Sequence, residues 1–475
     1  MQSSDKELVQ FVVAALASHG IQKVILSPGS RNASFAIAFD AHPQIETLVV
    51  HDERAAAFIA LGWAEQTQTP VAICCTSGSA CLNYYPALAE AYYRNIPILA
   101  LTADRPSKWI NQGDGQTIVQ AEVFKNHSHA YLAFDEDDFV ANAHHTQQLS
   151  AFLAHLSQPW KGPIHLNIGL NEPLYGLAPV QQFEFTPSLQ EFPNCVLPDF
   201  TLIEGKKIMV IVGQMDPNPA LAIQLARFAK YSNVVVLVEN TSNLQHELFN
   251  ACIDRSLNGF DATDPAYQPE VLISFGGAIV SKRIKAYLRQ IPLAIHWRCS
   301  YDFPQMNTYG TLSAHLPIAP IQLIEALLAA DLSLQTINFS GKWKAIDYLA
   351  KDKQAEFVTA ATTLFDYDVF NCLQGQINGP LQLHLANSSV VRYAQLFDPI
   401  AEVVYHSNRG TSGIDGSVST AVGAALASPN EQHLLICGDT SFIYDSNALW
   451  TSPFPKNLKI ILIQNHGGGI FQIIP

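Results

Sequence analysis

Short apolar runs rich in β-branched residues recur along the chain, each followed by a turn of Gly, Ser or Asn and then by an amphipathic stretch. Strands that are apolar along their whole length are typical of parallel sheets covered by helices on both faces. Their alternation with helices predicts an α/β fold of doubly wound parallel sheets. We expect strands at Lys23–Ser27, Thr47–His51, Val71–Thr76, Ile96–Thr102, Ile164–Ile168, Ile208–Gly213, Val234–Glu239, Val271–Phe275, Glu402–His406, His433–Cys437 and Leu458–Gln464.

Two stretches interrupt this pattern. Residues 172–205 contain five prolines and little periodicity, which predicts a linker, and residues 332–342 form a weaker polar break. Three domains are therefore expected, at residues 1–180, 200–335 and 345–475. The length of 475 residues agrees with this division at roughly 150 residues per domain.

The charge balance narrows the possible ligands. The chain contains 27 Lys and Arg residues but 41 Asp and Glu residues, which gives a formal net charge of −14. This negative charge disfavours nucleic acid binding, because that function needs a basic surface. An anionic substrate therefore has to be held by a few well-placed arginines. No apolar run is long enough to span a membrane. Eight cysteines without a Cys-x-x-Cys pair indicate reduced thiols in a cytoplasmic protein.

Ligands of parallel α/β sheets bind beyond the carboxyl ends of the strands, so the residues after each strand are the candidates. The first expected strand is followed by Gly29-Ser30-Arg31, where backbone N–H groups, a hydroxyl and a guanidinium suit a carboxylate or phosphate. The third continues into Ser77-Gly78-Ser79, whose small residues admit a ligand close to the backbone. Without a following Lys, this turn is no P-loop. Taken singly, each motif is more simply explained as an ordinary strand–helix turn.

Glu53 stands at the head of Ala55–Ala64, a stretch that is apolar nearly all round. Such a helix is buried, and burial raises the pKa of a carboxyl group unless a partner satisfies it. A carboxyl group with a raised pKa suits proton transfer. The alternative is a carboxylate that the helix dipole favours at an N-terminus.

The last third of the chain offers an oxygen-rich set of side chains. Residues 407–416 combine three glycines with Arg409 in another turn suited to an anion. Asp439 follows one expected strand and Asn465 follows the next, so we expect both at neighbouring strand ends. A carboxylate and an amide oxygen can share one hard cation, with a carbonyl from the adjacent glycine run, phosphate oxygens and water as further ligands. The alternative is two unrelated turns.

This combination resembles the thiamine diphosphate-dependent enzymes, which pair a Glu-bearing helix in one domain with a metal motif in another. The metal motif departs from the family pattern, because Thr440 replaces the second Gly and Gln464 the first Asn. Over nearly the whole chain, the sequence most resembles the 2-succinyl-5-enolpyruvyl-6-hydroxy-3-cyclohexene-1-carboxylate (SEPHCHC) synthases of menaquinone biosynthesis. The motifs concerned are Ser27-Pro-Gly-Ser-Arg31, His51-Asp-Glu-Arg54, Thr76-Ser-Gly78, Leu101-Thr-Ala-Asp-Arg-Pro106, Ser407-Asn-Arg-Gly-Thr-Ser-Gly-Ile-Asp415 and Gly438-Asp-Thr-Ser441.

The resemblance implies a pyrimidine-binding domain at residues 1–180, a central Rossmann-like domain at 200–335 and a diphosphate-binding domain at 345–475. In this family the third domain continues beyond the metal motif, so with Pro475 as the last residue we expect it to be incomplete and to bind its cofactor weakly. The resemblance further implies a homodimer or homotetramer with active sites at the subunit interface.

The implied reaction is decarboxylation of 2-oxoglutarate with thiamine diphosphate, followed by addition of the resulting fragment to isochorismate. By resemblance, Glu53 is the catalytic carboxyl group, and Asp439, Asn465 and Gly467 hold Mg²⁺ or Mn²⁺. The residues implied in cofactor binding are Thr76, Ser77, Gly78, Asn83, Gly410, Ser412, Ile414, Gly438, Thr440 and Ser441. Those implied in substrate binding are Ser388, Arg392 and Arg409 for 2-oxoglutarate and Ser30, Arg31, Arg105, Gln116, Lys282 and Arg283 for isochorismate.

Two other functions stay open at this point. One is another thiamine diphosphate-dependent decarboxylase or carboligase acting on a small 2-oxo acid, against which Arg392 and Arg409 argue. The other is a non-catalytic cofactor-binding relative, against which Glu53, Asp439 and Asn465 argue together.

Overall fold

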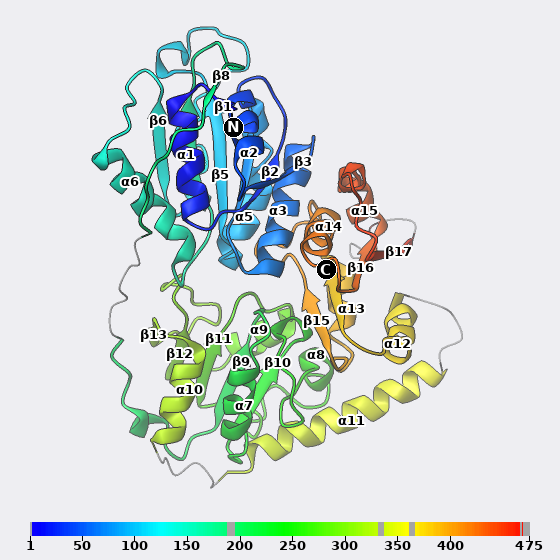
Figure 1. Cartoon of the computed structure of the whole chain (residues 1–475). Coiled ribbons are helices and arrows are strands. Elements are labelled where there is room, and N and C mark those ends of the chain that lie inside the picture. The colour runs from blue at the N-terminus through cyan, green and yellow to red at the C-terminus, as the bar shows by residue number, and fades with distance from the viewer. Residues whose placement is uncertain (1, 188–194, 331–336, 361–365, 466–467, 469–475) are drawn as a thin grey trace. The chain divides into compact units, whose positions relative to one another are not determined.

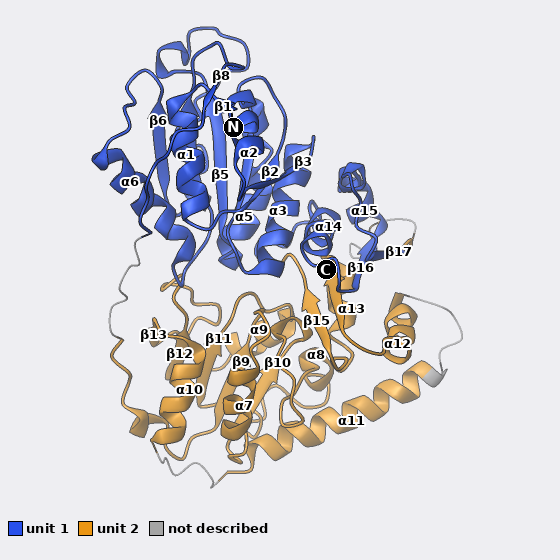
Figure 2. Ribbon diagram, viewed as in Figure 1, with its two compact units in different colours: residues 1–192, 410–462 blue, residues 193–409, 463–475 orange. Residues whose placement is uncertain are grey.

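The structure, a computed structural model, describes residues 2–187, 195–330, 337–360, 366–465 and 468 (Figure 1). The chain forms two compact units (Figure 2). Unit 1 comprises residues 1–192 and 410–462, and unit 2 comprises residues 193–409 and 463–475. The expected division into three domains stays a prediction. The two units divide the chain differently, since residues 410–462 of the third expected domain belong to unit 1.

Unit 1 contains a six-stranded sheet in the order β3-β2-β4-β5-β7-β6, in which every neighbouring pair is parallel. The predicted α/β fold with parallel sheets is confirmed. The edge strand β6 was not predicted, because acidic residues follow it in place of a Gly, Ser or Asn turn. The strands are β2 (Lys23–Leu26), β3 (Glu46–Val49), β4 (Val71–Cys75), β5 (Ile98–Asp104), β6 (Tyr131–Asp135) and β7 (Ile164–Gly169), with helices α1 (Glu7–Ser18), α2 (Ala33–Ala41), α3 (Glu53–Thr67), α4 (Ser79–Leu82), α5 (Tyr85–Arg94) and α6 (Ala143–Leu153).

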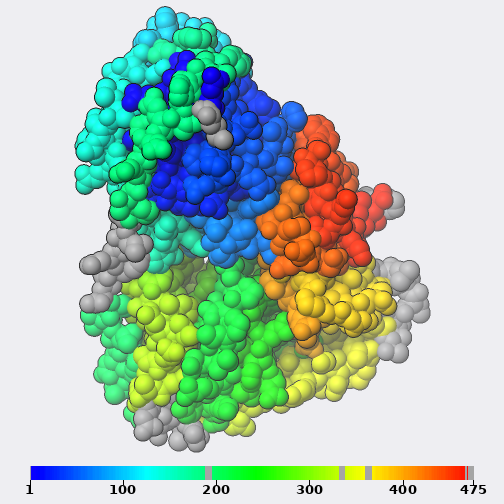
Figure 3. Space-filling model, in the orientation of Figure 1, coloured from blue at the N-terminus to red at the C-terminus, as the bar shows by residue number. Residues whose placement is uncertain are grey.

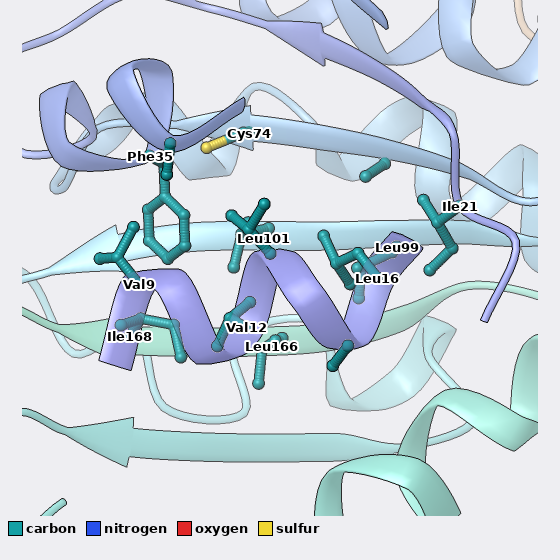
Figure 4. Packing of buried hydrophobic residues seen from close by; sticks show 14 of the residues in the cluster. Val9, Val12, Leu16, Ile21, Phe35, Cys74, Leu99, Leu101, Leu166 and Ile168 are labelled. Atoms are coloured by element: carbon teal, nitrogen blue, oxygen red, sulfur yellow. The ribbon is translucent and has the colours of Figure 1, made fainter. Parts of the chain in front are cut away.

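Helix α1 covers one face of this sheet (Figure 4). Val9, Val12 and Leu16 lie on the inner side of α1 and are buried in one cluster with Leu101 of β5 and Leu166 of β7. Their spacing along the helix is that of an amphipathic helix with one apolar face. Each such side chain contributes about 1.5–3 kcal/mol when it is fully buried.

The predicted linker at residues 172–205 is partly structured. Strand β8 (Leu177–Pro179) pairs antiparallel with β1 (Gln2–Ser4) at the start of the chain. Residues 188–194 of this stretch lie outside the described residues.

Helix α14 (Ser417–Ala427) packs against α3 within unit 1, and in the space-filling view the orange segment lies directly against the blue one (Figure 3). The two backbones come close at two glycines. A Cβ at Gly62 would overlap the carbonyl oxygen of Thr420, and a Cβ at Gly423 would overlap that of Ile59. This close approach requires glycine, and through it the segment after residue 410 joins the N-terminal sheet in one unit.

Unit 2 contains a five-stranded parallel sheet in the order β10-β9-β11-β12-β13. Alternate residues of β9 enter two different cores: Ile208 and Val210 point to one face, Met209 and Ile211 to the other. The continuous apolar run of this strand therefore reflects a sheet covered on both faces, as predicted. The elements are β9 (Ile208–Val212), α7 (Pro219–Phe228), β10 (Val234–Val238), α8 (Ile253–Ser256), β11 (Val271–Phe275), α9 (Lys282–Arg289), β12 (Ile295–Cys299), β13 (Ala314–Leu316) and α10 (Pro320–Ala329).

The remaining elements follow the second predicted break. Helix α11 (Phe339–Ala360) begins inside that break, so residues 332–342 are not loop throughout. In unit 2, strand β14, which was not predicted, pairs in parallel with β15. The elements are α12 (Asp366–Gln376), β14 (Leu381–Leu385), α13 (Ser389–Ala394) and β15 (Val403–His406), then β16 (His433–Gly438), α15 (Asp439–Tyr444) and β17 (Leu458–Ile463).

All eight cysteine thiols are free; Cys195 is half-buried, Cys372 is exposed and the others are buried. Burial raises the pKa of the Cys74 and Cys437 thiols to about 12, so both are inert. Within the described part of the chain, no helix combines the length and the apolar composition that a membrane span needs.

We expect Gly423→Ala to lower the free energy of unfolding by about 3 kcal/mol, because the new methyl group forces α14 away from α3. Urea unfolding followed by circular dichroism measures this loss. Gly375→Ala is the matched control, since Gly375 is exposed on α12 with open space around its Cβ position; there alanine should stabilise the helix. Equal effects in the two variants would contradict the packing argument.

Candidate active site

Glu53 is the first residue of α3, and its side chain is half-buried. Burial raises the pKa of its carboxyl group, and the charge on Asp52 raises it further, as the apolar helix predicts. The charge on Glu53 adds to burial in raising the pKa of the Cys75 and Cys81 thiols, which places the carboxyl group near the end of β4. A carboxyl group with a raised pKa is better matched to proton transfer near pH 7.

The residues on either side of Glu53 hold it in place. Asp52 caps α3, because its Oδ1 accepts from the N–H of Arg54 at 2.8 Å, while its Oδ2 accepts from Asn447 Nδ2 at 2.5 Å. The Arg54 guanidinium lies 4.6 Å from the ring centre of Tyr444, and its Nη2 donates to the Tyr444 carbonyl at 2.7 Å. The start of α3 is thus held to the segment after α14 within unit 1.

The turns after β2 and β4 lie side by side. The N–H of Arg31 donates to Thr76 Oγ1 at 3.2 Å, and a Cβ at Gly29 would overlap the Thr76 side chain. Ser77 is buried, whereas Ser30 is exposed. The structure therefore brings together two turns that the sequence could consider only singly.

Gly78 sits in a conformation that favours glycine, with φ +82°. A Cβ there would lie 3.0 Å from the backbone of Gln116, which itself has φ +52°. A predicted cofactor residue and a predicted substrate residue thus meet backbone to backbone. Asn83, another predicted cofactor residue, is exposed just after α4 and donates to the Ser79 carbonyl at 3.3 Å.

A buried chain of hydrogen bonds joins the Gly78 turn to Arg105. The N–H of Gly78 donates to Gln120 Oε1 at 2.8 Å, and Gln120 Nε2 donates to Asn167 Oδ1 at 2.9 Å. Asn167 Nδ2 donates to Asp104 Oδ2 at 2.9 Å, and Asp104 Oδ1 accepts from the N–H of Arg105 at 2.8 Å. Burial raises the pKa of Asp104 to about 6.

Arg31 and Arg105, both predicted to bind isochorismate, converge on one carboxylate. Arg31 is buried; its Nη1 donates to the Leu170 carbonyl at 2.9 Å and its Nη2 pairs with Glu172 Oε1 at 3.0 Å. Arg105 Nη1 lies 3.9 Å from the same oxygen. The remaining nitrogens of Arg105, Nε and Nη2, donate to the Gly115 carbonyl at 3.1 and 2.7 Å.

The turn that begins at Gly410 is held by Glu90, a buried residue of α5. Its Oε1 accepts from the N–H of Gly410 at 2.8 Å, and its Oε2 accepts from the N–H and hydroxyl of Thr411 at 2.6 and 2.9 Å. Arg94 lies 3.8 Å from the same carboxylate. The N–H of Gly410, a predicted cofactor residue, is thus bound by the chain itself, whereas Ser412, with φ +63°, is exposed.

Asp439 directly follows β16 and begins α15. Its Oδ1 accepts from the N–H of Thr440 at 2.7 Å and from the Thr440 hydroxyl at 3.2 Å. Ser441 is buried and donates from its hydroxyl to the Ile414 carbonyl at 3.1 Å. Two predicted cofactor turns therefore touch, and a Cβ at Gly438 would have open space around it.

The chemistry of the predicted metal ligands fits the metal. Asn465 is exposed, and its Nδ2 donates to Asp366 Oδ2 at 3.1 Å, while Gly467 lies outside the described residues. Among the described residues, no three His, Cys, Asp or Glu side chains gather to hold a metal ion. Mg²⁺ is usually bound by one or two carboxylates together with phosphate oxygens and water. The Asp439 carboxylate and the Asn465 amide oxygen are donors of the required kind.

Ser388 and Arg409 follow the neighbouring strands β14 and β15 in unit 2. Asn387 links these strand ends, because its Oδ1 accepts from Arg409 Nη1 at 2.6 Å. Ser388 has φ +76° and ψ −129°, a strained backbone for a residue with a side chain. Arg392, on α13, is half-buried, and its Nη1 lies 3.5 Å from the Val280 carbonyl.

Lys282 and Arg283 are exposed at the start of α9. Below them, the buried carboxyl group of Glu239 accepts from the N–H of Ser281 at 2.8 Å. The pKa of Glu239 is raised to about 7, and burial is the largest cause. The backbone hydrogen bonds to its carboxylate and the charge on Arg409 act in the opposite direction but are outweighed.

Glu90, Gln120 and Glu172 were not predicted from the sequence. Their partners Gly410, Gly78 and Arg31 lie 320, 42 and 141 positions away. No rule based on the spacing of residues along the chain predicts contacts over such separations. The one local signal was a carboxylate inside the otherwise apolar stretch of α5.

Comparisons with known proteins show which family the chain is similar to. The family model "Thiamine pyrophosphate enzyme, N-terminal TPP binding domain" matches residues 6–125, and "Thiamine pyrophosphate enzyme, C-terminal TPP binding domain" matches residues 388–472. A SEPHCHC synthase of Flavobacterium johnsoniae is 42% identical over 98% of this chain and 85% of its own length. Synthases of the same name from Desulfotalea psychrophila and Porphyromonas gingivalis are 40% and 36% identical, over 96% and 99% of this chain and 84% of their own length.

The buried carboxyl group of Asp445 should make the stability of the fold depend on pH. It is buried beside α14, where its Oδ2 and Oδ1 accept from the N–H and hydroxyl of Ser419 at 2.6 and 2.7 Å, and burial raises its pKa from 3.8 to about 7. The folded state therefore keeps a proton that the unfolded state releases, so the stability from Asp445 is lost as pH rises toward 7.

We expect Asp445→Asn to cost more free energy of unfolding at pH 5 than at pH 8, with a change of up to about 1.4 kcal/mol per pH unit. Urea unfolding of both proteins across this range measures the difference. A constant difference would show that Asp445 does not titrate there.

The strained backbone at Ser388 generates a second prediction. We expect Ser388→Gly to raise the free energy of unfolding by about 1 kcal/mol, because glycine adopts this conformation without strain. Ser388→Ala keeps the Cβ and should leave stability nearly unchanged. Thermal and urea unfolding check both, and no gain for glycine over alanine would refute the strain.

Proposed function

This chain belongs to the SEPHCHC synthase family, and on that premise we propose that it decarboxylates 2-oxoglutarate and adds the resulting four-carbon fragment to isochorismate. It is a thiamine diphosphate-dependent enzyme that forms a carbon–carbon bond. The observation that carries the proposal is the half-buried Glu53 with its raised pKa, at the start of a buried helix and close enough to Cys75 at the end of β4 to affect the pKa of its thiol.

Glu53 supplies the proton chemistry. Thiamine diphosphate, when bound, would supply the nucleophilic carbon and the electron sink that decarboxylation of a 2-oxo acid needs. The Glu53 carboxyl group would exchange a proton with the aminopyrimidine ring of the cofactor, a task that a raised pKa favours. Asp52 and Arg54, held to the segment after α14, keep Glu53 at a constant position.

The Ile414 and Ser441 turns would hold the rest of the cofactor. The open space at Gly438 leaves room beside Asp439 for a diphosphate with Mg²⁺ or Mn²⁺. Asn465 would complete the protein's share of metal ligands, together with the carbonyl of Gly467.

The arginines would offset the negative charge that the substrates bring to an acidic chain. Two dicarboxylate substrates bring four negative charges to a chain of net charge −14. Ser388, Arg392 and Arg409 would bind 2-oxoglutarate, since Ser388 and Arg409 stand at neighbouring strand ends. Arginine is suited to this task because it keeps its charge and binds carboxylates with two parallel hydrogen bonds.

The isochorismate site would be formed by the second arginine group. Arg31 and Arg105 already converge on a carboxylate, and Gln116 lies against the cofactor turn at Gly78. The other residues proposed for this substrate are Ser30, Lys282 and Arg283. We further propose a cytoplasmic homodimer or homotetramer, in line with the low charged fraction of 14%.

The proposal is tested by following both substrates in one reaction. We expect isochorismate and 2-oxoglutarate to disappear in equal amounts, with one CO₂ released each time, only when thiamine diphosphate and Mg²⁺ or Mn²⁺ are added. Consumption of 2-oxoglutarate with isochorismate left intact would identify another decarboxylase of the family. Cofactor binding without turnover would identify a non-catalytic relative.

Glu53→Gln tests the catalytic residue itself. The amide keeps the shape but cannot exchange the proton, so we expect turnover to fall roughly 10²–10⁴-fold. Thiamine diphosphate affinity, measured by calorimetry, should change little. Glu65→Gln, on the same helix, is unsuitable as a control because the Glu65 side chain is buried in its pair with Arg94. Glu46→Gln serves instead, because the Glu46 side chain is mostly exposed. Near-normal turnover of Glu53→Gln would refute its role.

A further inference from the structure

We infer that Glu172 is a specificity-determining residue of the proposed reaction: its carboxylate occupies the Arg31–Arg105 pair until a carboxylate of isochorismate displaces it. The inference rests on the proposed function, which assigns both arginines to isochorismate. Glu172 lies at the start of the predicted linker, and nothing in its local sequence marks it as part of a site.

The exposure of the three side chains differs in the way that displacement requires. The side chains of Arg31 and Arg105 are 7% and 19% exposed, whereas that of Glu172 is 72% exposed. Glu172 Oε1 is 3.0 Å from Arg31 Nη2 but 3.9 Å from Arg105 Nη1, beyond hydrogen-bond distance. The carboxylate is therefore loosely held, on the open side of two largely buried cations.

The backbone around Glu172 is anchored on both sides. The N–H of Asn171 donates to Glu136 Oε2 at 2.7 Å, and Ser34 Oγ donates to the Leu174 carbonyl at 2.7 Å. Rotation of its own side chain is therefore enough to release the arginines. No movement of the chain is needed.

The arginines keep their positions without Glu172. Arg31 Nη1 is held by the Leu170 carbonyl, and Arg105 Nε and Nη2 are held by the Gly115 carbonyl. Arg105 Nε also donates to Thr117 Oγ1 at 2.9 Å and lies 3.6 Å from Asp114 Oδ2, so Arg105 keeps one acidic partner without Glu172. Carbonyl and hydroxyl groups orient a guanidinium without neutralising it. Loss of Glu172 would thus leave a more positive and equally ordered receptor for a substrate carboxylate.

Competition of this kind lowers affinity for every anion but favours the ligand that makes further contacts. A dicarboxylate that also reaches other residues of the site can displace Glu172, whereas a small anion gains little. A partly exposed ion pair of this type changes a binding equilibrium roughly two- to fivefold. Glu172 would therefore protect the site from cellular anions at a modest cost in substrate affinity.

The experiment compares Glu172→Gln with Glu46→Gln in the full chain loaded with thiamine diphosphate and Mg²⁺. Glu46 is the matched control, because its side chain is 73% exposed and it pairs with another cation, Lys23. We expect KM for isochorismate to fall roughly two- to fivefold in Glu172→Gln only. Inorganic sulfate should also inhibit this variant at lower concentrations. KM for 2-oxoglutarate is the internal reference.

A gain in affinity does not arise from structural damage, so an unchanged or higher KM for isochorismate in Glu172→Gln would overturn the inference. If the wild-type chain does not consume isochorismate at all, the proposed function fails instead. In that case, the pairing of Glu172 with Arg31 and Arg105 is tested without substrate. Both arginines are labelled with phenylglyoxal, and the labelled sites are mapped by mass spectrometry. Faster labelling in Glu172→Gln supports the inference, and equal labelling overturns it.

Discussion

Unit 1 depends on the backbone contact between α3 and α14. Gly62 and Gly423 remove the side chains that would separate the two helices, so each backbone rests on a carbonyl of the other. The contact joins the helix that starts at Glu53 to the segment that carries Ile414 and Asp439. At the start of the same helix, burial raises the pKa of Glu53.

Carboxylates of the chain itself occupy positions suited to anions. Glu90 is buried, pairs with Arg94 and receives the N–H groups of Gly410 and Thr411, so it is a permanent part of the turn. Glu172 is mostly exposed and pairs loosely with two arginines, so exchange for a ligand is easy. The difference in burial decides the difference in role, because desolvated charges need their partners and exposed charges do not.

The sequence predicted the class of fold and most strands, because continuous apolar runs ending in Gly, Ser or Asn turns are local signals. It also predicted the direction of the pKa shift of Glu53 from the apolar helix that follows. Strands β6 and β14 were not predicted, because acidic residues follow β6 and because Gln382 and His384 interrupt the apolar run of β14. The positive φ angles of Gln116, Ser388 and Ser412 had no signal in residue type, since none of the three is a glycine.

The motifs of the chain by themselves determined the family, the candidate residues and the need for arginines in an acidic protein. Each motif is a short run whose chemistry depends on neighbours in sequence. Only the tertiary structure decided which residues meet: Arg31 and Arg105 at Glu172, Gly78 at Gln116, Glu90 at Gly410. The two residues of each pair belong to segments that are far apart in the chain. They come into contact because of the way the helices pack on the sheets, and no local sequence pattern encodes that packing.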